Sequence, residues 1–348
     1  MDNISVKLPK IEQIPIKLRD LYERFGYTKY RMAKFEPYDF YREHKGFLKS
    51  EGILTFNGPK GKLLALKPDV TMSIAKSVKK DKEYKYFYVE NVYRTDGGEY
   101  NEINQIGIEY IGGVGEYPCV EVLYLACRTL DVISQEYVLS IGHAGVWNAC
   151  FEYLNLTEQV KSEVLAKIKN KSLHEVDSIL KNCGVSEKGV NLVHSLASIS
   201  DEISVAVNNF KSITKNLPFE DISNELTCLA DALKEVGVGN KCRLDFSVTG
   251  DLTYYNGIVF NGYVCGVAKT MLSGGRYDNL LKSLDKDHNA IGFAVYTEEL
   301  QRAFASEKVE NDCLIKVNDY SAKDAIKKVV QAVDEGLYVK AVTEVENA

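Results

Sequence analysis

The sequence is poor in the features that mark membrane-bound and secreted proteins. No run of apolar residues reaches about 18, the shortest length that would span a bilayer as a helix. A membrane-spanning helix is therefore not expected. The N-terminus, MDNISVKLPK, lacks the basic-then-apolar order of a signal peptide, so we expect a cytoplasmic protein with no membrane partner.

Basic residues are not in excess either. The 348 residues carry 43 Lys and Arg against 49 Asp and Glu, a net charge of −6 with histidine neutral. Proteins dominated by nucleic-acid binding cluster Lys and Arg against phosphates, so this balance argues against that class. With 45% hydrophobic and 26% charged residues the chain should fold, as two domains or as one large domain with an insertion.

Metal ligands are sparse. The eight cysteines include no CxxC pair, and the five histidines do not cluster at zinc-ligand spacing. We expect reduced, buried thiols, no metal site and no cofactor.

Hydrophobic spacing predicts a mixed α+β chain. Apolar steps of three and four predict helices over 10–26 and 119–136, and Asp69 is placed to cap a helix after Pro68. Strand-forming residues surround an Asn-Gly-Pro-Lys-Gly turn within 53–66, and a polar loop is predicted to join two longer strands. Further strands are predicted over 84–93, 103–111, 137–142, 242–248 with a continuation through 254–264, and 290–295.

The middle of the chain changes character. Between about 150 and 236 almost every apolar residue follows helical spacing, which predicts a helical insertion. We predict a core over residues 1–308, an insertion over about 151–240 and a short β-α-β segment over 309–348. The core should be a mostly antiparallel sheet flanked by helices, because strands occur in runs without regular βαβ alternation.

Five segments, taken in chain order, resemble the motifs of class II aminoacyl-tRNA synthetases of the histidyl type. They extend over about residues 12–305, and one such segment alone would be a weak signal. The resemblance implies a class II synthetase-like core. The segments are the helix ending in FGY with the following KFEPYDFY, LKPDVTMSIAKS, YVENVYRTDGGEYNEINQIGIEYIGG, LDFSVTGDLTYYNGIVFNGYV and LSGGRYDNLL.

The resemblance also implies a pocket for histidine or a similar ligand. Carboxylates can hold an ammonium or imidazolium group, and an amide or a tyrosine hydroxyl can bond a ring nitrogen. The alternative is that these residues only preserve the fold, with Arg94 paired to a pocket carboxylate and Gly274, Gly275 and Arg276 forming a structural turn. The candidate ligand-binding residues are Asp69, Thr71, Arg94, Gln105, Glu109, Tyr254, Tyr255, Gly274, Gly275 and Arg276.

Departures from the synthetase pattern argue against amino-acid activation. That reaction drives a carboxylate against the α-phosphate of ATP, so fixed cations must meet the negative charge. The resemblance implies three arginines, of which Arg94 is present, while Gly250 and Glu299 stand at the other two positions. Losing one preorganised donor typically costs on the order of 10²–10³ in rate. We therefore expect no catalytic residues.

Features for tRNA binding are also reduced. Only residues 309–348 follow the last motif, too few for the family's anticodon-binding domain. The GGEYNE loop of the second motif contains no Lys or Arg. We expect no tRNA partner.

This combination resembles the regulatory subunits of short-form ATP phosphoribosyltransferase. The resemblance implies a non-catalytic subunit, required for activity and histidine feedback of the short catalytic subunit in the first step of L-histidine biosynthesis. It also implies a homodimer through the core within a hetero-oligomer. An alternative stays open: a divergent amino-acid-activating enzyme related to histidyl-tRNA synthetase, suggested by Arg94 and the pocket residues.

Overall fold

The structure is a computed structural model that describes residues 7–48, 52–79, 82–96, 98–304 and 311–343. Contacts divide the chain into two units. The larger unit is Ile14–Ala303, and the smaller one combines Met1–Gln13 with Phe304–Ala348. The two units are described separately below.

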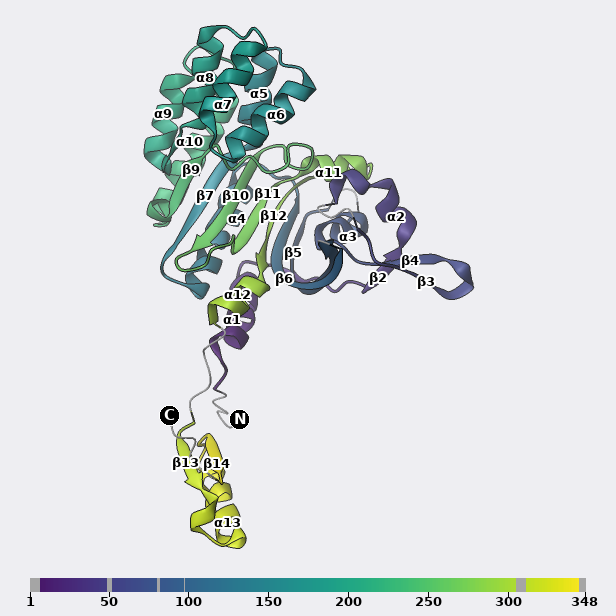
Figure 1. The fold of residues 1–348 in the computed structure, drawn as a ribbon, viewed down its shortest axis with the longest axis vertical. Helices are drawn as coiled ribbons and strands as arrows, with labels where there is room; N and C mark the ends of the chain where they lie inside the picture. Colours follow the sequence, from purple (N-terminus) through teal and green to yellow (C-terminus); the bar gives the residue numbers. More distant parts are fainter. Residues whose placement is uncertain (1–6, 49–51, 80–81, 97, 305–310, 344–348) are drawn as a thin grey trace. The chain divides into compact units, whose positions relative to one another are not determined.

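Within the described residues, the larger unit is built on a nine-stranded sheet (Figure 1). Neighbouring strands pair antiparallel except for β1 with β5 and β7 with β9, which are parallel. The predicted fold class, a mostly antiparallel sheet with flanking helices, is confirmed. In spatial order the strands are β1 (Thr28–Lys29), β5 (Tyr84–Asp96), β6 (Glu99–Gly112), β12 (Asn289–Tyr296), β11 (Leu272–Arg276), β10 (Ile258–Val264), β7 (Tyr137–His143), β9 (Cys242–Asp245) and β8 (Ser200–Glu202).

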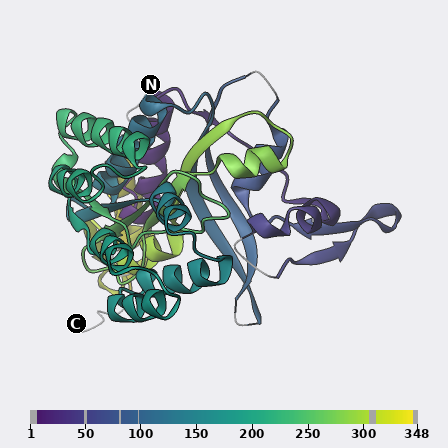
Figure 2. The ribbon, with the colours of Figure 1, turned by 90° about the horizontal axis from the view of Figure 1, so that it is seen from above.

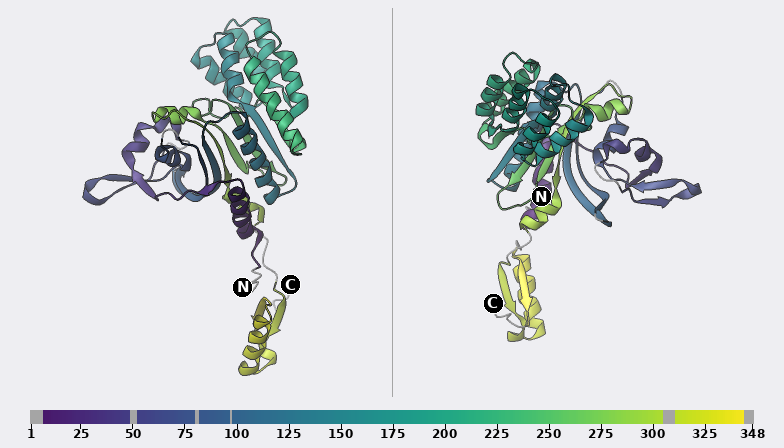
Figure 3. Two further views of the ribbon diagram at one scale, coloured as in Figure 1. Left: turned by 180° about the vertical axis from the view of Figure 1, so that it is seen from behind. Right: turned by 45° about the horizontal axis from the view of Figure 1, so that its top comes forward.

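One face of the sheet is covered by two helices, α1 (Lys10–Arg24) and α4 (Glu116–Ile133). Tyr22 of α1 packs against the rings of Phe87 and Phe293, and its hydroxyl meets Thr129 of α4 at 2.8 Å. The view from behind shows α4 along the strands (Figure 3). This face holds the large apolar side chains of the central strands, because alternate residues of a strand point to opposite faces.

The opposite face of the central strands carries small or polar side chains instead. The register places Gly107, Ala294, Ser273, Asn261 and Ser140 side by side across five strands. Two helices border this face, α3 (Val70–Ser77) and α11 (Asp278–Ser283). Small side chains leave space above a sheet, so this face can contain a pocket.

The helical middle of the chain gathers beside the β7–β9 end of the sheet (Figure 2). From α6 to α10 consecutive helices pack against one another, and α10 also packs against α4. The region is almost wholly helical, as predicted, with the exception of β8, which joins the main sheet. The helices are α5 (Ala144–Tyr153), α6 (Glu158–Lys169), α7 (Leu173–Asn182), α8 (Glu187–Ala197), α9 (Ile203–Ile213) and α10 (Glu220–Glu235).

A three-stranded antiparallel sheet extends beyond β5 and β6 (Figure 1). Its order is β2 (Phe35–Pro37), β4 (Leu63–Leu66) and β3 (Thr55–Asn57), with α2 (Tyr38–Glu43) following β2. The hairpin predicted within 53–66 is confirmed as β3 and β4. Helix α12 (Thr297–Phe304) follows β12 at the end of the larger unit.

The C-terminal β-α-β pattern is also confirmed. Strands β13 (Cys313–Lys316) and β14 (Val339–Val342) pair in parallel, and α13 (Ala322–Asp334) connects them. Within the same unit Lys7 forms an ion pair with Asp312 and donates its backbone N–H to the Tyr338 hydroxyl.

Two local predictions are wrong. The loop expected between β5 and β6 is mostly strand, because pairing continues as far as Asp96 with Glu99. The alternative interpretation of Gly274, Gly275 and Arg276 as a structural turn is wrong, because all three lie in β11, which pairs on one side with β10 and on the other with β12. A pair of glycines is typical of a turn, but here it allows close packing inside a sheet.

Candidate functional site

The small-residue face contains a small pocket of about 30 Å³, enough for about one water molecule. Strands β5, β6, β11 and β12 supply its floor, and the segment before α3, the loop before β10 and the start of α11 supply its walls. Its lining residues are Asp69, Thr71, Tyr88, Arg94, Gln105, Glu109, Tyr254, Tyr255, Ser273, Gly274, Tyr277, Gly292, Phe293 and Ala294.

Glu109 lies at the centre of this pocket and is only 2% exposed. Its Oε1 accepts a hydrogen bond of 2.7 Å from the Thr71 hydroxyl, and its Oε2 accepts one from the Tyr277 hydroxyl. Burial, and then the nearby Glu109 charge, raise the pKa of Tyr277 well above its usual value, so this hydroxyl stays protonated as a donor. Two charge-assisted hydrogen bonds thus fix the carboxylate in place.

Asp69 has a structural and an electrostatic partner. Its Oδ1 accepts the backbone N–H of Met72 at 2.9 Å, which caps α3 as the sequence predicted. Its Oδ2 lies 3.5 Å from Nη2 of Arg94, whose Nε donates to the carbonyl of Pro68 at 2.9 Å. The alternative reading of Arg94, that it pairs with a pocket carboxylate, therefore describes its state in this structure.

Tyr254 and Tyr255 pack against each other, with ring centroids 4.8 Å apart. Burial, followed by the charge of Asp69, raises the pKa of Tyr254 well above its usual value. The loop before them contains Gly250 at φ +62°, and a Cβ there would lie 2.8 Å from the Tyr255 ring. At this position, where the resemblance implies an arginine, the left-handed backbone and the Tyr255 ring both disfavour a larger side chain.

Glycines on the strands make room for these side chains. A Cβ on Gly292 would lie 1.8 Å from Oε2 of Glu109, and one on Gly275 would lie 2.7 Å from the Tyr255 ring. A Cβ on Gly107 would collide with the Tyr88 hydroxyl. The sheet therefore needs glycine at these points for Glu109 and Tyr255 to occupy their positions.

The structure brings most of the predicted site residues together. Eight of the ten line the pocket: Asp69, Thr71, Arg94, Gln105, Glu109, Tyr254, Tyr255 and Gly274.

Two predicted residues do not line the pocket. The Tyr255 ring packs closely against Gly275, and Nε of Arg276 donates a hydrogen bond to Asp278 at 2.9 Å. The pocket residues Tyr88, Tyr277 and Gly292 were not predicted. The strand alternation through Glu109 and the register to the neighbouring strands would have been needed to find them.

Glu299 stands at one of the positions where the resemblance implies an arginine. Its side chain is buried in α12 and forms an ion pair with Arg302, one turn later. It does not line the pocket. The negative charge of Glu299 is therefore neutralised locally by Arg302.

The pocket has a negative charge balance. Among the described residues that line it, two carboxylates, Asp69 and Glu109, face one guanidinium, Arg94. The Gln105 side chain is buried beside them and has no hydrogen-bond partner among the described residues. A fixed carboxylate and a free amide suit a ligand with an ammonium or imidazole group. The present volume would have to expand to admit one.

Comparison with known proteins relates this arrangement to a family. The family model described as histidyl-tRNA synthetase matches residues 5–300. A relative from Caldanaerobacter subterraneus subsp. tengcongensis, an "ATP phosphoribosyltransferase regulatory subunit", is 30% identical over 345 residues, which cover 94% of this chain and 88% of the relative. The chain belongs to this regulatory-subunit branch of the histidyl-tRNA synthetase family.

Solved structures share the fold of this family. An ATP phosphoribosyltransferase regulatory subunit/histidyl-tRNA synthetase from Bacillus halodurans C aligns with a TM-score of 0.79 at 23% identity, covering 100% of this chain and 94% of the other. A chain of the ATP phosphoribosyl transferase (HisG:HisZ) complex from Thermotoga maritima aligns with a TM-score of 0.66 at 18% identity, covering 82% and 97%. These similarities support the class II synthetase-like core.

Family membership makes the two substituted arginine positions informative. Arg94 remains, but it is paired with Asp69, while Gly250 and Glu299 supply no cation to the pocket.

None of the helices that the structure describes is both long and apolar enough to span a membrane.

Proposed function

We propose that this chain is the non-catalytic regulatory subunit of a short-form ATP phosphoribosyltransferase, the first enzyme of L-histidine biosynthesis. In this role it binds the short catalytic subunit in a hetero-oligomer, is required for its activity and carries histidine feedback. The observation that carries the proposal is a nearly intact synthetase-like pocket without its cation set. Gly250 and Glu299 replace two of the three expected arginines, and Asp69 pairs with the third.

The same proposal assigns histidine to the pocket around Glu109. The negative charge balance and the free Gln105 amide support a ligand with an ammonium and an imidazole group. Since the pocket has room for about one water molecule, histidine would select or induce a more open arrangement. Two states with different affinity are what allosteric control requires.

We further propose a cytoplasmic homodimer through the synthetase-like core, with no tRNA and no membrane partner. The absence of Lys and Arg from GGEYNE supports the exclusion of tRNA. Residues 309–348 would then stand in place of the anticodon-binding domain.

A mixing experiment tests the role directly. The short catalytic subunit from the same genome is assayed for transfer of the phosphoribosyl group to ATP, with and without an equimolar amount of this protein. We expect formation of phosphoribosyl-ATP to rise when the protein is added. Unchanged activity of a catalytic subunit that is folded and binds both its substrates would contradict the regulatory role.

Histidine feedback is tested with a matched pair of variants. Glu109→Gln removes the pocket charge and keeps the side-chain size, whereas Glu99→Gln changes an exposed glutamate on the same strand. A lost charge-assisted contact corresponds to roughly ten- to a hundredfold weaker binding. We expect Glu109→Gln to raise the histidine concentration for half-inhibition by that factor, with Glu99→Gln unchanged. Equal half-inhibition concentrations for both variants would contradict the assignment of histidine to this pocket.

The alternative function is amino-acid activation, suggested by Arg94 in the pocket. Exchange of pyrophosphate with ATP across a panel of amino acids distinguishes it. We expect no signal above background. A histidine-dependent signal would favour amino-acid activation over the regulatory role.

A further inference from the structure

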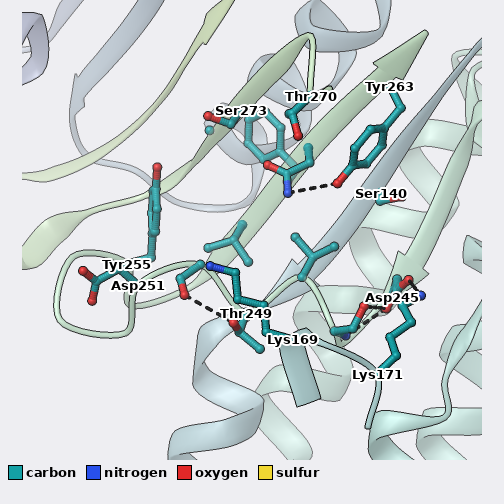
Figure 4. Close-up of a pocket in the computed structure, with 17 residues that line it drawn as sticks. Ser140, Lys169, Lys171, Asp245, Thr249, Asp251, Tyr255, Tyr263, Thr270 and Ser273 are labelled. Carbon is teal, nitrogen blue, oxygen red and sulfur yellow. Dashed lines mark hydrogen bonds and ion pairs between the residues drawn. The ribbon is translucent and has the colours of Figure 1, made fainter. Parts of the chain in front are cut away.

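A second, larger cavity of about 700 Å³ lies beside the pocket around Glu109 (Figure 4). The pocket and the cavity share Tyr255, Ser273 and Gly274 as lining residues. The cavity lies between the β7, β10 and β11 strands and the end of α6 in the helical region. Its volume falls within the range of ordinary small-molecule sites, about 300–1,000 Å³.

The floor of this cavity is a row of uncharged polar side chains. Ser140, Asn261 and Ser273 occupy the same register position on three adjacent strands, and Tyr263 follows two residues after Asn261 on the same face. Thr270 adds a hydroxyl at the edge. The hydroxyls of Ser140 and Thr270 have no hydrogen-bond partner among the described residues. Such a row can donate to and accept from several hydroxyl groups of one ligand.

A single free cation faces this row. Lys169, the last residue of α6, lines the cavity and reaches into it from the helix side, opposite Tyr263 and Ser273 (Figure 4). Its ammonium group has no partner among the residues that the structure describes. The neighbouring Lys171 is different, because it binds Asp245 at 2.9 Å.

The remaining charged group is Asp251, on the Tyr255 side of the cavity (Figure 4). Its Oδ1 accepts hydrogen bonds from the backbone and hydroxyl of Thr253. Of the two carboxylates that line the cavity, Asp245 is paired with Lys171 and Asp251 accepts hydrogen bonds from Thr253, whereas the Lys169 ammonium group has no partner among the described residues. Lysine acts on phosphate as a point charge, while the polar row suits hydroxyls.

We propose that this cavity is a second ligand site, for a phosphorylated sugar. The phosphate would meet Lys169, and the sugar hydroxyls would meet Ser140, Asn261 and Tyr263. This site adjoins the pocket around Glu109, because Tyr255, Ser273 and Gly274 line both. Because α6 belongs to the helical region and Asn261 to the sheet, such a ligand would link these two parts of the larger unit.

Isothermal titration of the full chain with ribose 5-phosphate tests the site. Lys169→Ala removes the cation, and Lys181→Ala is the control, an exposed lysine of the same helical region outside the cavity. We expect Lys169→Ala to weaken binding by about tenfold or more, since a charge-assisted contact is lost. Lys181→Ala should bind as the wild type does. No saturable binding by the wild type, or equal affinity in the two variants, would overturn the proposal.

Two further probes separate the parts of the ligand. Ribose without phosphate should bind more weakly than ribose 5-phosphate, and so should inorganic phosphate alone. If inorganic phosphate bound as tightly as ribose 5-phosphate, the polar row would not contribute to binding. If ribose bound as tightly as ribose 5-phosphate, Lys169 would not contribute. Asn261→Ala should weaken ribose 5-phosphate and leave inorganic phosphate unaffected; an unchanged affinity for ribose 5-phosphate would contradict the assigned contact. These titrations need no catalytic subunit, so their outcome is independent of the regulatory role.

Discussion

Gly292 is the position where the smallest change should have the largest effect on the pocket. An alanine Cβ at this site would lie 1.8 Å from Oε2 of Glu109 and 2.4 Å from the carbonyl oxygen of Ile108. The carbonyl belongs to the β6 backbone and cannot rotate away. The carboxylate can move only by leaving the Tyr277 hydroxyl.

The expected cost of Gly292→Ala follows from these contacts. Overpacking of a well-packed interior typically costs about 1–3 kcal/mol. Loss of a hydrogen bond to a charged group adds about 1.5–3 kcal/mol, although the two effects are not additive when they share an atom. We therefore expect the free energy of unfolding to fall by at least about 2 kcal/mol.

Urea unfolding followed by circular dichroism measures this change. Gly113→Ala is the control, because a Cβ at Gly113 has no atom within 4 Å and its backbone is not in the left-handed region. That variant should unfold within about 0.5 kcal/mol of the wild type. If Gly292→Ala matched Gly113→Ala, the close packing of β12 against Glu109 would be refuted.

Other predictions follow from charged groups of the same unit. Asp69→Ala should destabilise the protein by about 1 kcal/mol or more, because the α3 cap is lost. Asp69→Asn keeps a cap and should lose mainly the attraction to Arg94. Thermal unfolding measures both variants, and equal losses of stability would contradict the role of the cap. Burial tends to raise the pKa of Asp245, but hydrogen bonding from Ser247 and Lys171 outweighs it and lowers the pKa. The stabilisation is therefore present above the unfolded pKa of aspartate, about 3.9, and is lost as pH falls through the lower folded pKa. Asp245→Asn should cost stability at pH 7 and less at pH 3, and a cost independent of pH would exclude the charge as its source.

Local patterns were sufficient for much of the secondary structure. Steps of three and four predicted α1 and α4, alternation predicted the strands, and Asp69 before Val70 predicted a helix cap. Each of these features depends on residues within a few positions of one another. The collinear motifs also brought eight of the ten predicted residues to one pocket, because the family fold fixes where each motif lies.

The sequence alone therefore determined the fold class, the family and most members of the pocket. The tertiary structure alone decided that Gly274 and Gly275 lie in a strand, that Arg302 neutralises Glu299, and that the pocket has room for only about one water molecule. It also decided that Ser140, Asn261 and Ser273 form one row, although they are far apart in the chain. The physical reason is that cross-strand register and side-chain packing join distant residues, and local spacing carries no record of which strands become neighbours.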